Sequence, residues 1–161
     1  PVLDTLKYIR HETRVWLEIT TLLIPGRNDS DEELTRMCEW IARELGDDVP
    51  LHFTAFHPDY KMTDIPPTPP QTLVRARKIA HGAGLKHVYS GNVHNVEGDT
   101  THCSSCHSRL IVRDWYEILE YNLKEDGTCP RCGTPLAGRF DKFSGQFGRP
   151  RIPVSIHRAK M

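Results

Sequence analysis

Two pairs of cysteines constrain this 161-residue chain more than any other feature of its sequence. The pairs are Cys103-x-x-Cys106 and Cys129-x-x-Cys132, and 22 residues separate them. A gap of two residues lets both thiolates of a pair reach one ion from a single tight turn, and two such turns complete a tetrahedral set of four sulfur ligands. The spacing therefore predicts a metal centre that holds zinc, with iron in a rubredoxin-like centre as the alternative.

Other uses of these cysteines stay open at this stage. Two disulfides or a redox-active dithiol would fit the same spacing. The chain does not open with a basic segment followed by an apolar run, which indicates a cytoplasmic and reducing compartment where disulfides are rare. Three histidines, His94, His102 and His107, lie close to the first pair in sequence, and any of them could replace one cysteine ligand.

The first 93 residues alternate segments that are typical of strands and helices. A capping box, Ser30-x-x-Glu33, begins a helix whose apolar stripe includes the fifth cysteine, Cys38. The second half of the first strand is continuously apolar, which predicts burial on both faces. Strands are expected at 15–24, 51–56 and 86–89, and helices at 1–11, 30–45 and 71–82. This order predicts βαβ units and a parallel sheet.

Three polar loops follow the three predicted strands, at 25–29, 57–61 and 90–94. Ligands of parallel α/β sheets collect at the carboxyl ends of the strands, so the loops should share one edge of the sheet. They hold His, Asn, Asp and Gly, which suit a polar ligand that the backbone approaches closely. Plain turns, with a locally hydrogen-bonded His57, are the alternative interpretation.

Residues 98–140 form a small module around the cysteines. The segment 109–121 is strand-like, and its imperfect alternation leaves a hairpin or a strand plus a short turn open. The layout is that of a zinc ribbon or a rubredoxin-like module, in which the metal substitutes for a core. From Arg131 onward the chain carries seven Lys or Arg and one acid, so 141–161 is expected to be a basic, extended tail.

The overall charge limits the classes of partner. Lys and Arg number 21, Asp and Glu number 21, and the formal net charge is zero. A dedicated duplex-binding protein needs a surplus of cations, so nucleic acid is not the expected partner, although the basic tail could form an arm for it or for an acidic protein. No apolar run approaches the length that a membrane-spanning helix needs.

Several strings of the sequence, taken in order, resemble the later half of a radical SAM enzyme of the pyruvate formate-lyase-activating type. They are VWLEITTLLIPG at 15–26, ND at 28–29, PLHFTAFHPD at 50–59, TP at 68–69, GLKHVY at 84–89 and GNV at 91–93. With the C-terminal cysteine pairs, the resemblance narrows to the radical SAM enzyme of the AmmeMemoRadiSam system and covers about residues 1–140. It implies that 1–97 is the C-terminal part of a partial TIM-like (β/α)6 barrel, followed by the four-cysteine module at 98–140.

The resemblance also implies a chemistry. Such enzymes bind S-adenosylmethionine (SAM) and a 4Fe–4S cluster, cleave SAM reductively and generate a 5′-deoxyadenosyl radical. The CxxxCxxC motif that holds the cluster does not occur in this sequence. The chain alone is therefore not competent, and we expect a piece of a longer enzyme whose missing N-terminal half-barrel supplies the cluster ligands. The start at Pro1, without an initiator Met, agrees with that expectation.

By resemblance, Thr20 and Leu22 lie beside the SAM adenosine, and His57 matches a histidine that approaches the cofactor. No catalytic residue is assigned. The substrate is a protein or a small molecule, and a glycyl-radical protein or another member of the AmmeMemoRadiSam system is the implied partner. The alternative function, from a different class, is a non-catalytic zinc-binding module that docks a protein or a nucleic acid.

Overall fold

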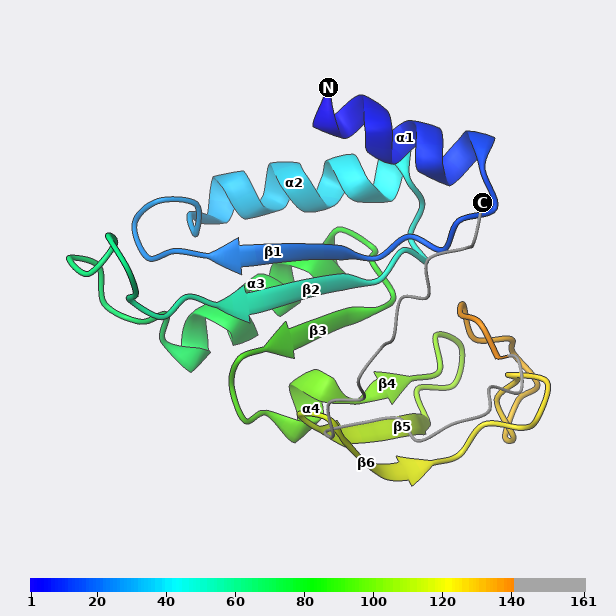
Figure 1. The fold of residues 1–161 in the computed structure, drawn as a ribbon. Coiled ribbons are helices and arrows are strands. Elements are labelled where there is room, and N and C mark those ends of the chain that lie inside the picture. The colour runs from blue at the N-terminus through cyan, green and yellow to red at the C-terminus, as the bar shows by residue number, and fades with distance from the viewer. Residues whose placement is uncertain (141–161) are drawn as a thin grey trace, which may run out of the picture.

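The computed structural model describes residues 1–140, so the predicted basic tail at 141–161 lies outside the described residues. The chain forms a layered α/β part followed by a small antiparallel sheet (Figure 1). The elements are α1 (Val2–Glu12), β1 (Ile19–Leu23), α2 (Asp31–Glu44), β2 (Leu51–Ala55), α3 (Pro70–Gly82), β3 (Val88–Gly91), α4 (Val96–Asp99), β4 (Thr101–His102), β5 (Arg109–Asp114) and β6 (Glu117–Tyr121).

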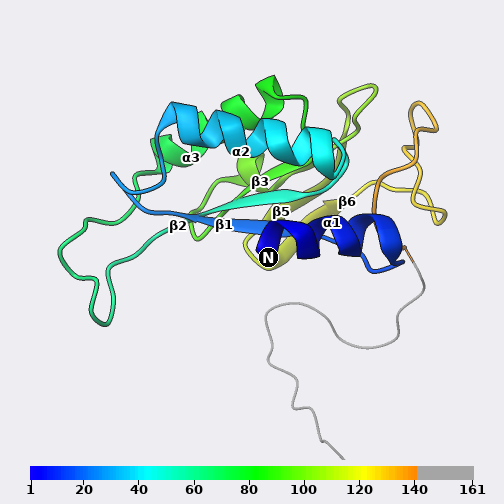
Figure 2. The ribbon, with the colours of Figure 1, turned by 90° about the horizontal axis from the view of Figure 1, so that it is seen from above.

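The predicted parallel sheet is present. Its strand order is β1-β2-β3, and both pairings are parallel, with Ile19 opposite Leu51 and Leu51 opposite Val88. Helices α2 and α3, which connect these strands, lie on the same face of the sheet (Figure 2). The chain therefore moves through the sheet in one direction and crosses it on one side only.

The third strand begins two residues later than its sequence predicts. The backbone N–H of Lys86 donates to the carbonyl of Asp47, in the turn before β2, at 2.9 Å. The Lys86 ammonium pairs with the Asp47 carboxylate at 2.8 Å. These two contacts tie Lys86 to a neighbouring turn instead of to the sheet, and the strand runs from Val88 to Gly91.

The main core fills the space between the two helices and the sheet. The helical spacing of the apolar residues on α2 and α3 places them toward the strands, as the sequence predicts. Cys38 belongs to this core and is fully buried. Its buried members are Leu23, Leu34, Cys38, Ile41, Leu45, Val49, Leu51, Phe53, Ala55, Leu73, Ala76, Ala80, Leu85 and Val88.

Helix α2 begins as its capping box predicts. The Ser30 hydroxyl accepts a hydrogen bond from the backbone N–H of Glu33 at 3.3 Å. The helix is followed by Gly46, whose φ of 103° favours glycine and whose N–H donates to the Ile41 carbonyl at 3.1 Å. These local signals fix both ends of the helix that covers β1.

The prediction that the first strand is buried on both faces is wrong. Leu23 is fully buried, whereas Leu22 is 42% exposed and Thr20 is exposed. Side chains of a strand alternate between its two faces, and α2 and α3 cover only one of them. The continuous apolar run therefore does not reflect two covered faces within residues 1–140.

The segment 109–121 is a hairpin, one of the two arrangements that its pattern allows. Strands β4, β5 and β6 form an antiparallel sheet in that order, and Trp115 takes a φ of 54° in the turn between β5 and β6. Every residue of β6 is exposed, including Ile118, Leu119 and Tyr121. In the part of the chain that the structure describes, we find no helix whose length and apolarity would let it cross a membrane.

Candidate metal centre and adjoining cleft

The four paired cysteines converge on one point. Their sulfur atoms all lie within 4.8 Å of one another. Cys103 Sγ is 3.5 Å from Cys132 Sγ, and Cys106 Sγ is 3.7 Å from Cys129 Sγ. A tetrahedral ion with metal–sulfur bonds of about 2.3 Å separates its ligands by about 3.8 Å, so the group could hold such an ion. A disulfide needs about 2.05 Å, and all four cysteines are free thiols.

The two turns that carry the ligands, 103–108 and 129–134, repeat one backbone pattern. In each, the N–H of the first cysteine donates to the carbonyl five residues later at 2.9 Å, and its carbonyl accepts from the N–H four residues later. That fourth position takes a positive φ, 56° at His107 and 75° at Gly133. The local sequence thus aims the two sulfurs of each pair at one point before the pairs meet.

Hydroxyl groups beside the cysteines favour thiolates, the form that binds metals. The Ser108 hydroxyl lies 3.4 Å from Cys129 Sγ and lowers the pKa of that thiol to about 6. The Thr134 hydroxyl, 3.2 Å from Cys132 Sγ, lowers the pKa of that thiol as well. Burial acts in the opposite direction on Cys103 and raises its pKa.

The three nearby histidines are not members of the ligand group that the described residues form. His94 Nδ1 lies 3.0 Å from an oxygen of Asp114, and His102 Nε2 lies 3.7 Å from an oxygen of Glu97. His107 occupies the left-handed position of the first turn. The four sulfurs complete the set without them.

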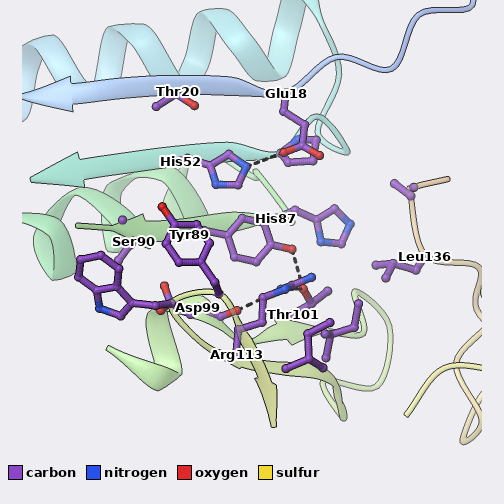
Figure 3. Close-up of a pocket in the computed structure, with 18 of the residues that line it drawn as sticks. Glu18, Thr20, His52, His87, Tyr89, Ser90, Asp99, Thr101, Arg113 and Leu136 are labelled. Atoms are coloured by element: carbon purple, nitrogen blue, oxygen red, sulfur yellow. Dashed lines mark hydrogen bonds and ion pairs between the residues drawn. The ribbon is translucent and has the colours of Figure 1, made fainter. Parts of the chain in front are cut away.

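A cleft of about 940 Å³ lies between the uncovered face of the parallel sheet and the antiparallel sheet (Figure 3). Alternate positions of β1, β2 and β3, and of the residues that flank them, supply its floor. Because side chains alternate along a strand, polar residues two apart share this face. The floor positions are Glu18, Thr20, His52, Thr54, Tyr89 and Gly91.

A hydrogen bond and a ring stack join the three parallel strands across the floor. His52 Nε2 lies 2.8 Å from Glu18 Oε2, and the His52 ring stacks on the Tyr89 ring with centres 5.1 Å apart. The hydrogen bond with His52 lowers the pKa of Glu18, so this carboxyl stays ionised. The imidazole is therefore held between a carboxylate and an aromatic ring.

A second group of contacts joins the floor to the metal module. The hydroxyls of Tyr89 and Thr101 lie 2.9 Å apart. Arg113 Nη1 donates to the Thr101 hydroxyl at 2.9 Å and to the Asp99 carbonyl at 3.1 Å. The guanidinium carbon of Arg113 lies 5.9 Å from the centre of the Tyr89 ring. Burial raises the pKa of Tyr89, so its phenol stays protonated.

The three residues that the resemblance places near SAM do not come together in this cleft. Thr20 lines it, whereas Leu22 and His57 are not among its lining residues. The Leu22 side chain lies on the same face of β1 as Thr20, nearer the carboxyl end of the strand. His57 is exposed in the loop after β2. Thr20 therefore lies within the cleft, and the other two lie toward the edge where the strands end.

Polar residues of the loops after β1 and β3 have structural roles. The Asn28 side chain accepts from the Ile24 N–H at 2.8 Å and donates to the Leu22 carbonyl at 2.9 Å. The Asn92 amide donates to the Ala55 carbonyl at 3.2 Å. The Asn28 amide closes its own turn, which agrees with the plain-turn interpretation of the first loop, whereas the Asn92 amide ties the loop after β3 to the end of β2.

The residues of the cleft that sequence patterns did not single out are Glu18, His52, Tyr89, Asp99, Thr101 and Arg113. For two of them, Glu18 and His52, a signal was present. Glu18 with Thr20, and His52 with Thr54, place polar side chains at alternate positions of segments typical of buried strands. Polar residues at alternate positions of a parallel strand indicate a face turned to a ligand or to solvent.

The sequence was compared with family models and with curated proteins. No family model matches the chain. Over 137 residues it is 44% identical to the protein MJ0808 of Methanocaldococcus jannaschii, an alignment that covers 84% of this chain and 41% of that protein. The chain thus spans less than half the length of the curated relative that it matches.

Proposed function

We propose that this chain is the C-terminal portion of a radical SAM enzyme, in which residues 1–97 complete a partial (β/α)6 barrel and residues 98–140 add a zinc-binding module. The observation that carries the proposal is the winding of the parallel sheet. The strand order β1-β2-β3 advances in one direction with α2 and α3 on one face. Barrels are wound this way, whereas doubly wound sheets place helices on both faces.

The uncovered face of the sheet gives independent support. In a barrel this face would turn to the interior, and here it carries a carboxylate, an imidazole and a phenol in one cleft that a polar ligand could enter. The length of MJ0808 also supports the proposal that this chain belongs to a longer protein, because the alignment covers 41% of MJ0808.

The iron–sulfur cluster does not fit the cysteines of this chain. Four of them form the convergent sulfur group, and Cys38 is buried in the core on α2. Burial raises the pKa of the Cys38 thiol to about 11, which disfavours the thiolate that a cluster needs. The proposal therefore assigns the cluster ligands to another part of the longer protein. Residues 1–140 would contribute to binding SAM but not to holding the cluster.

SAM, which supplies the radical chemistry through its reductive cleavage, is proposed to lie along the carboxyl ends of the strands. Thr20 and Leu22 would line its adenosine, and the exposed imidazole of His57 would approach it from the loop after β2. Ligands of parallel α/β sheets bind at this edge, which supports the placement.

The first test is the coding sequence before Pro1, where a CxxxCxxC motif is expected. The second test is equilibrium binding of SAM to the full-length protein, reconstituted with iron and sulfide under anaerobic conditions. His57→Ala should weaken binding about tenfold, the scale of one lost hydrogen bond in a partly buried site. His11→Ala is the matched control, because His11 lies on α1 and bonds to the Glu44 carbonyl. A full-length protein without iron, or without affinity for SAM, would contradict the proposal.

A second candidate function is a non-catalytic zinc module that docks a partner protein. It is favoured by the exposed apolar side chains of β6, where Ile118, Leu119 and Tyr121 are each more than half exposed. Replacement of Leu119, which does not line the cleft, by Ser should weaken capture of the partner while the zinc content stays unchanged. A cluster motif in the full-length protein would decide between the two functions in favour of the enzyme.

A further inference from the structure

Arg113 lies in the cleft and uses one nitrogen of its guanidinium group for contacts within the fold. It belongs to β5, is half-buried and lines the cleft beside Tyr89 and Thr101 (Figure 3). Both of its hydrogen bonds within residues 1–140 start from Nη1. Its other N–H groups have no partner in that part of the chain, so most of the donors of a rigid, planar fork remain available.

The guanidinium acts on the two carboxyl groups that line the cleft at longer range, where its attraction acts to lower the pKa of Glu18 and of Asp99. None of the ion pairs between residues 1–140 includes Arg113. Some arginines of the layered part have acidic partners, such as Arg10 with Asp48 and Arg75 with Asp31, whereas Arg77 donates to the carbonyls of Val88 and Glu97. A half-buried cation without a direct carboxylate partner needs other acceptors, and the anionic group of a ligand would supply them to Arg113.

We propose that Arg113 is the anion-binding residue of the cleft and that it takes a carboxylate or phosphate group of a small-molecule ligand. Guanidinium recognises both anions through two parallel hydrogen bonds. The hydroxyls of Tyr89 and Thr101 lie beside it and bond to each other, which leaves one hydroxyl proton of the pair for a ligand. The cleft volume of about 940 Å³ is within the range of small-molecule sites.

Two carboxyl groups also line the cleft, and each is engaged by neighbouring groups. Glu18 is bound to His52 at 2.8 Å and to the indole N–H of Trp16 at 2.7 Å. Burial raises the pKa of the Asp99 carboxyl, and the attraction of Arg113 acts in the opposite direction. The second arginine of the cleft, Arg139, is exposed and donates to the Arg14 carbonyl. Arg113 is thus the better placed cation.

This inference gives the metal module a role beyond its own stability. The sheet that carries Arg113 is anchored by the four-cysteine group, because β4 precedes Cys103 and the β5–β6 hairpin lies between the two cysteine pairs. The module then supplies the wall of the cleft that recognises the anion, and the parallel sheet supplies the floor. The inference goes beyond SAM cleavage and does not depend on it.

The test is calorimetric titration of the zinc-loaded, full-length protein with inorganic phosphate and, separately, with succinate. At least one of these probes should bind saturably to one site. Arg113→Gln should weaken that binding about tenfold or more, because a charge-assisted bidentate contact is lost. Arg109→Gln is the matched control: it removes the same charge from the same strand, but Arg109 pairs weakly with Glu120 at 3.9 Å and does not line the cleft. Absence of saturable binding, or equal affinities in wild type and Arg113→Gln, would overturn the inference.

A second measurement avoids any effect of the substitution on folding, since Arg113 also bonds to Thr101 and Asp99. The wild-type protein is treated with an arginine-specific dicarbonyl reagent, and modification is followed by peptide mass spectrometry. The anion that binds should slow modification of Arg113 several-fold and leave Arg109 unaffected. Equal rates with and without the anion would overturn the inference.

Repeating the titration with saturating SAM separates two sources of the anion. Binding that persists assigns Arg113 to a ligand other than SAM. Binding that SAM abolishes, together with protection of Arg113 by SAM, assigns it to the carboxylate of SAM itself. Loss of anion binding without that protection would contradict a direct role for Arg113.

Discussion

In the layered α/β part, fourteen buried residues form one apolar cluster between two helices and a sheet, whereas the buried cluster of the metal module comprises Cys103, Leu110, Ile111 and Cys129. Two of those four residues are members of the four-cysteine group. The first region can fold on apolar burial, and the second has too little apolar surface to do so. The comparison teaches that one chain can combine two sources of stability, and that each should fail under a different treatment.

Metal removal should have the largest effect and should act on one region only. A chelator that strips the four-cysteine group should remove about 10 kcal/mol of binding free energy, which for such sites is folding free energy. Amide hydrogen exchange should then rise across 101–136 and stay slow in 19–55 and 73–91. Readdition of zinc is the control and should restore protection. Simultaneous loss of protection in both regions would show that the layered part is not independent.

Phe53→Ala should destabilise the layered part and leave the metal module unchanged. Phe53 is fully buried at the centre of the parallel sheet, and its truncation should cost about 3–5 kcal/mol in the free energy of unfolding of the layered part. The zinc content should stay at its wild-type value. Tyr60→Ala, at a residue that is 85% exposed, is the control and should change stability by less than about 0.5 kcal/mol. Loss of zinc in Phe53→Ala would break the comparison.

Cys38 lies in the apolar core and Cys129 in the four-cysteine group, so the two regions can also be compared with one residue type. Cys38→Ser should cost about 1–2 kcal/mol, because it places a hydroxyl in an apolar core, and it should leave the zinc content unchanged. Cys129→Ser should abolish stoichiometric zinc and destabilise the module more. Urea denaturation with zinc analysis of both variants checks this. Equal zinc losses in the two variants would contradict the ligand assignment.

Glu18→Gln should have the smallest effect, less than about 1 kcal/mol near pH 7, because the Glu18–His52 pair is partly exposed. The bond with His52 lowers the pKa of Glu18 in the folded state. The ionised Glu18 carboxylate therefore contributes to the free energy of unfolding above its unfolded pKa of about 4.3. This contribution is lost as the pH falls through the lower pKa that Glu18 has in the folded state.

Thermal unfolding of Glu18→Gln and wild type between pH 3 and pH 7 measures that contribution. The difference in stability should shrink toward acid pH. Glu117→Gln, which removes a carboxylate from an exposed position of β6, is the control for the loss of one negative charge. A difference that grows as the pH falls would have the wrong sign for this pair.

Much of the fold could be predicted from local patterns. The capping box at Ser30 and the helical stripe that ends at Gly46 located α2 almost to the residue. The three strands and α3 were located within a few residues, and the structure confirms their parallel order. The cysteine spacing identified the group that could hold a metal. Each of these signals lies within a few turns of the chain, where sequence and conformation are directly linked.

The cleft could not be predicted in the same way. Its network joins Glu18, His52, Tyr89, Thr101 and Arg113, which lie far apart in sequence. The continuous apolar run predicted burial of the second half of the first strand on both faces, because apolar composition alone does not reveal which face a helix covers. The proposed SAM contacts at Thr20, Leu22 and His57 rest on resemblance, and SAM binding remains their test.

The sequence by itself determined the order of helices and strands and the four sulfur ligands, because turns, caps and cysteine spacing act over a few residues. Only the tertiary structure decided that the helices leave one face of the parallel sheet uncovered. It also decided that Arg113 of the metal module contacts the Tyr89 ring on that face. The physical reason is that a cleft is made by side chains from strands that meet only after the chain has folded.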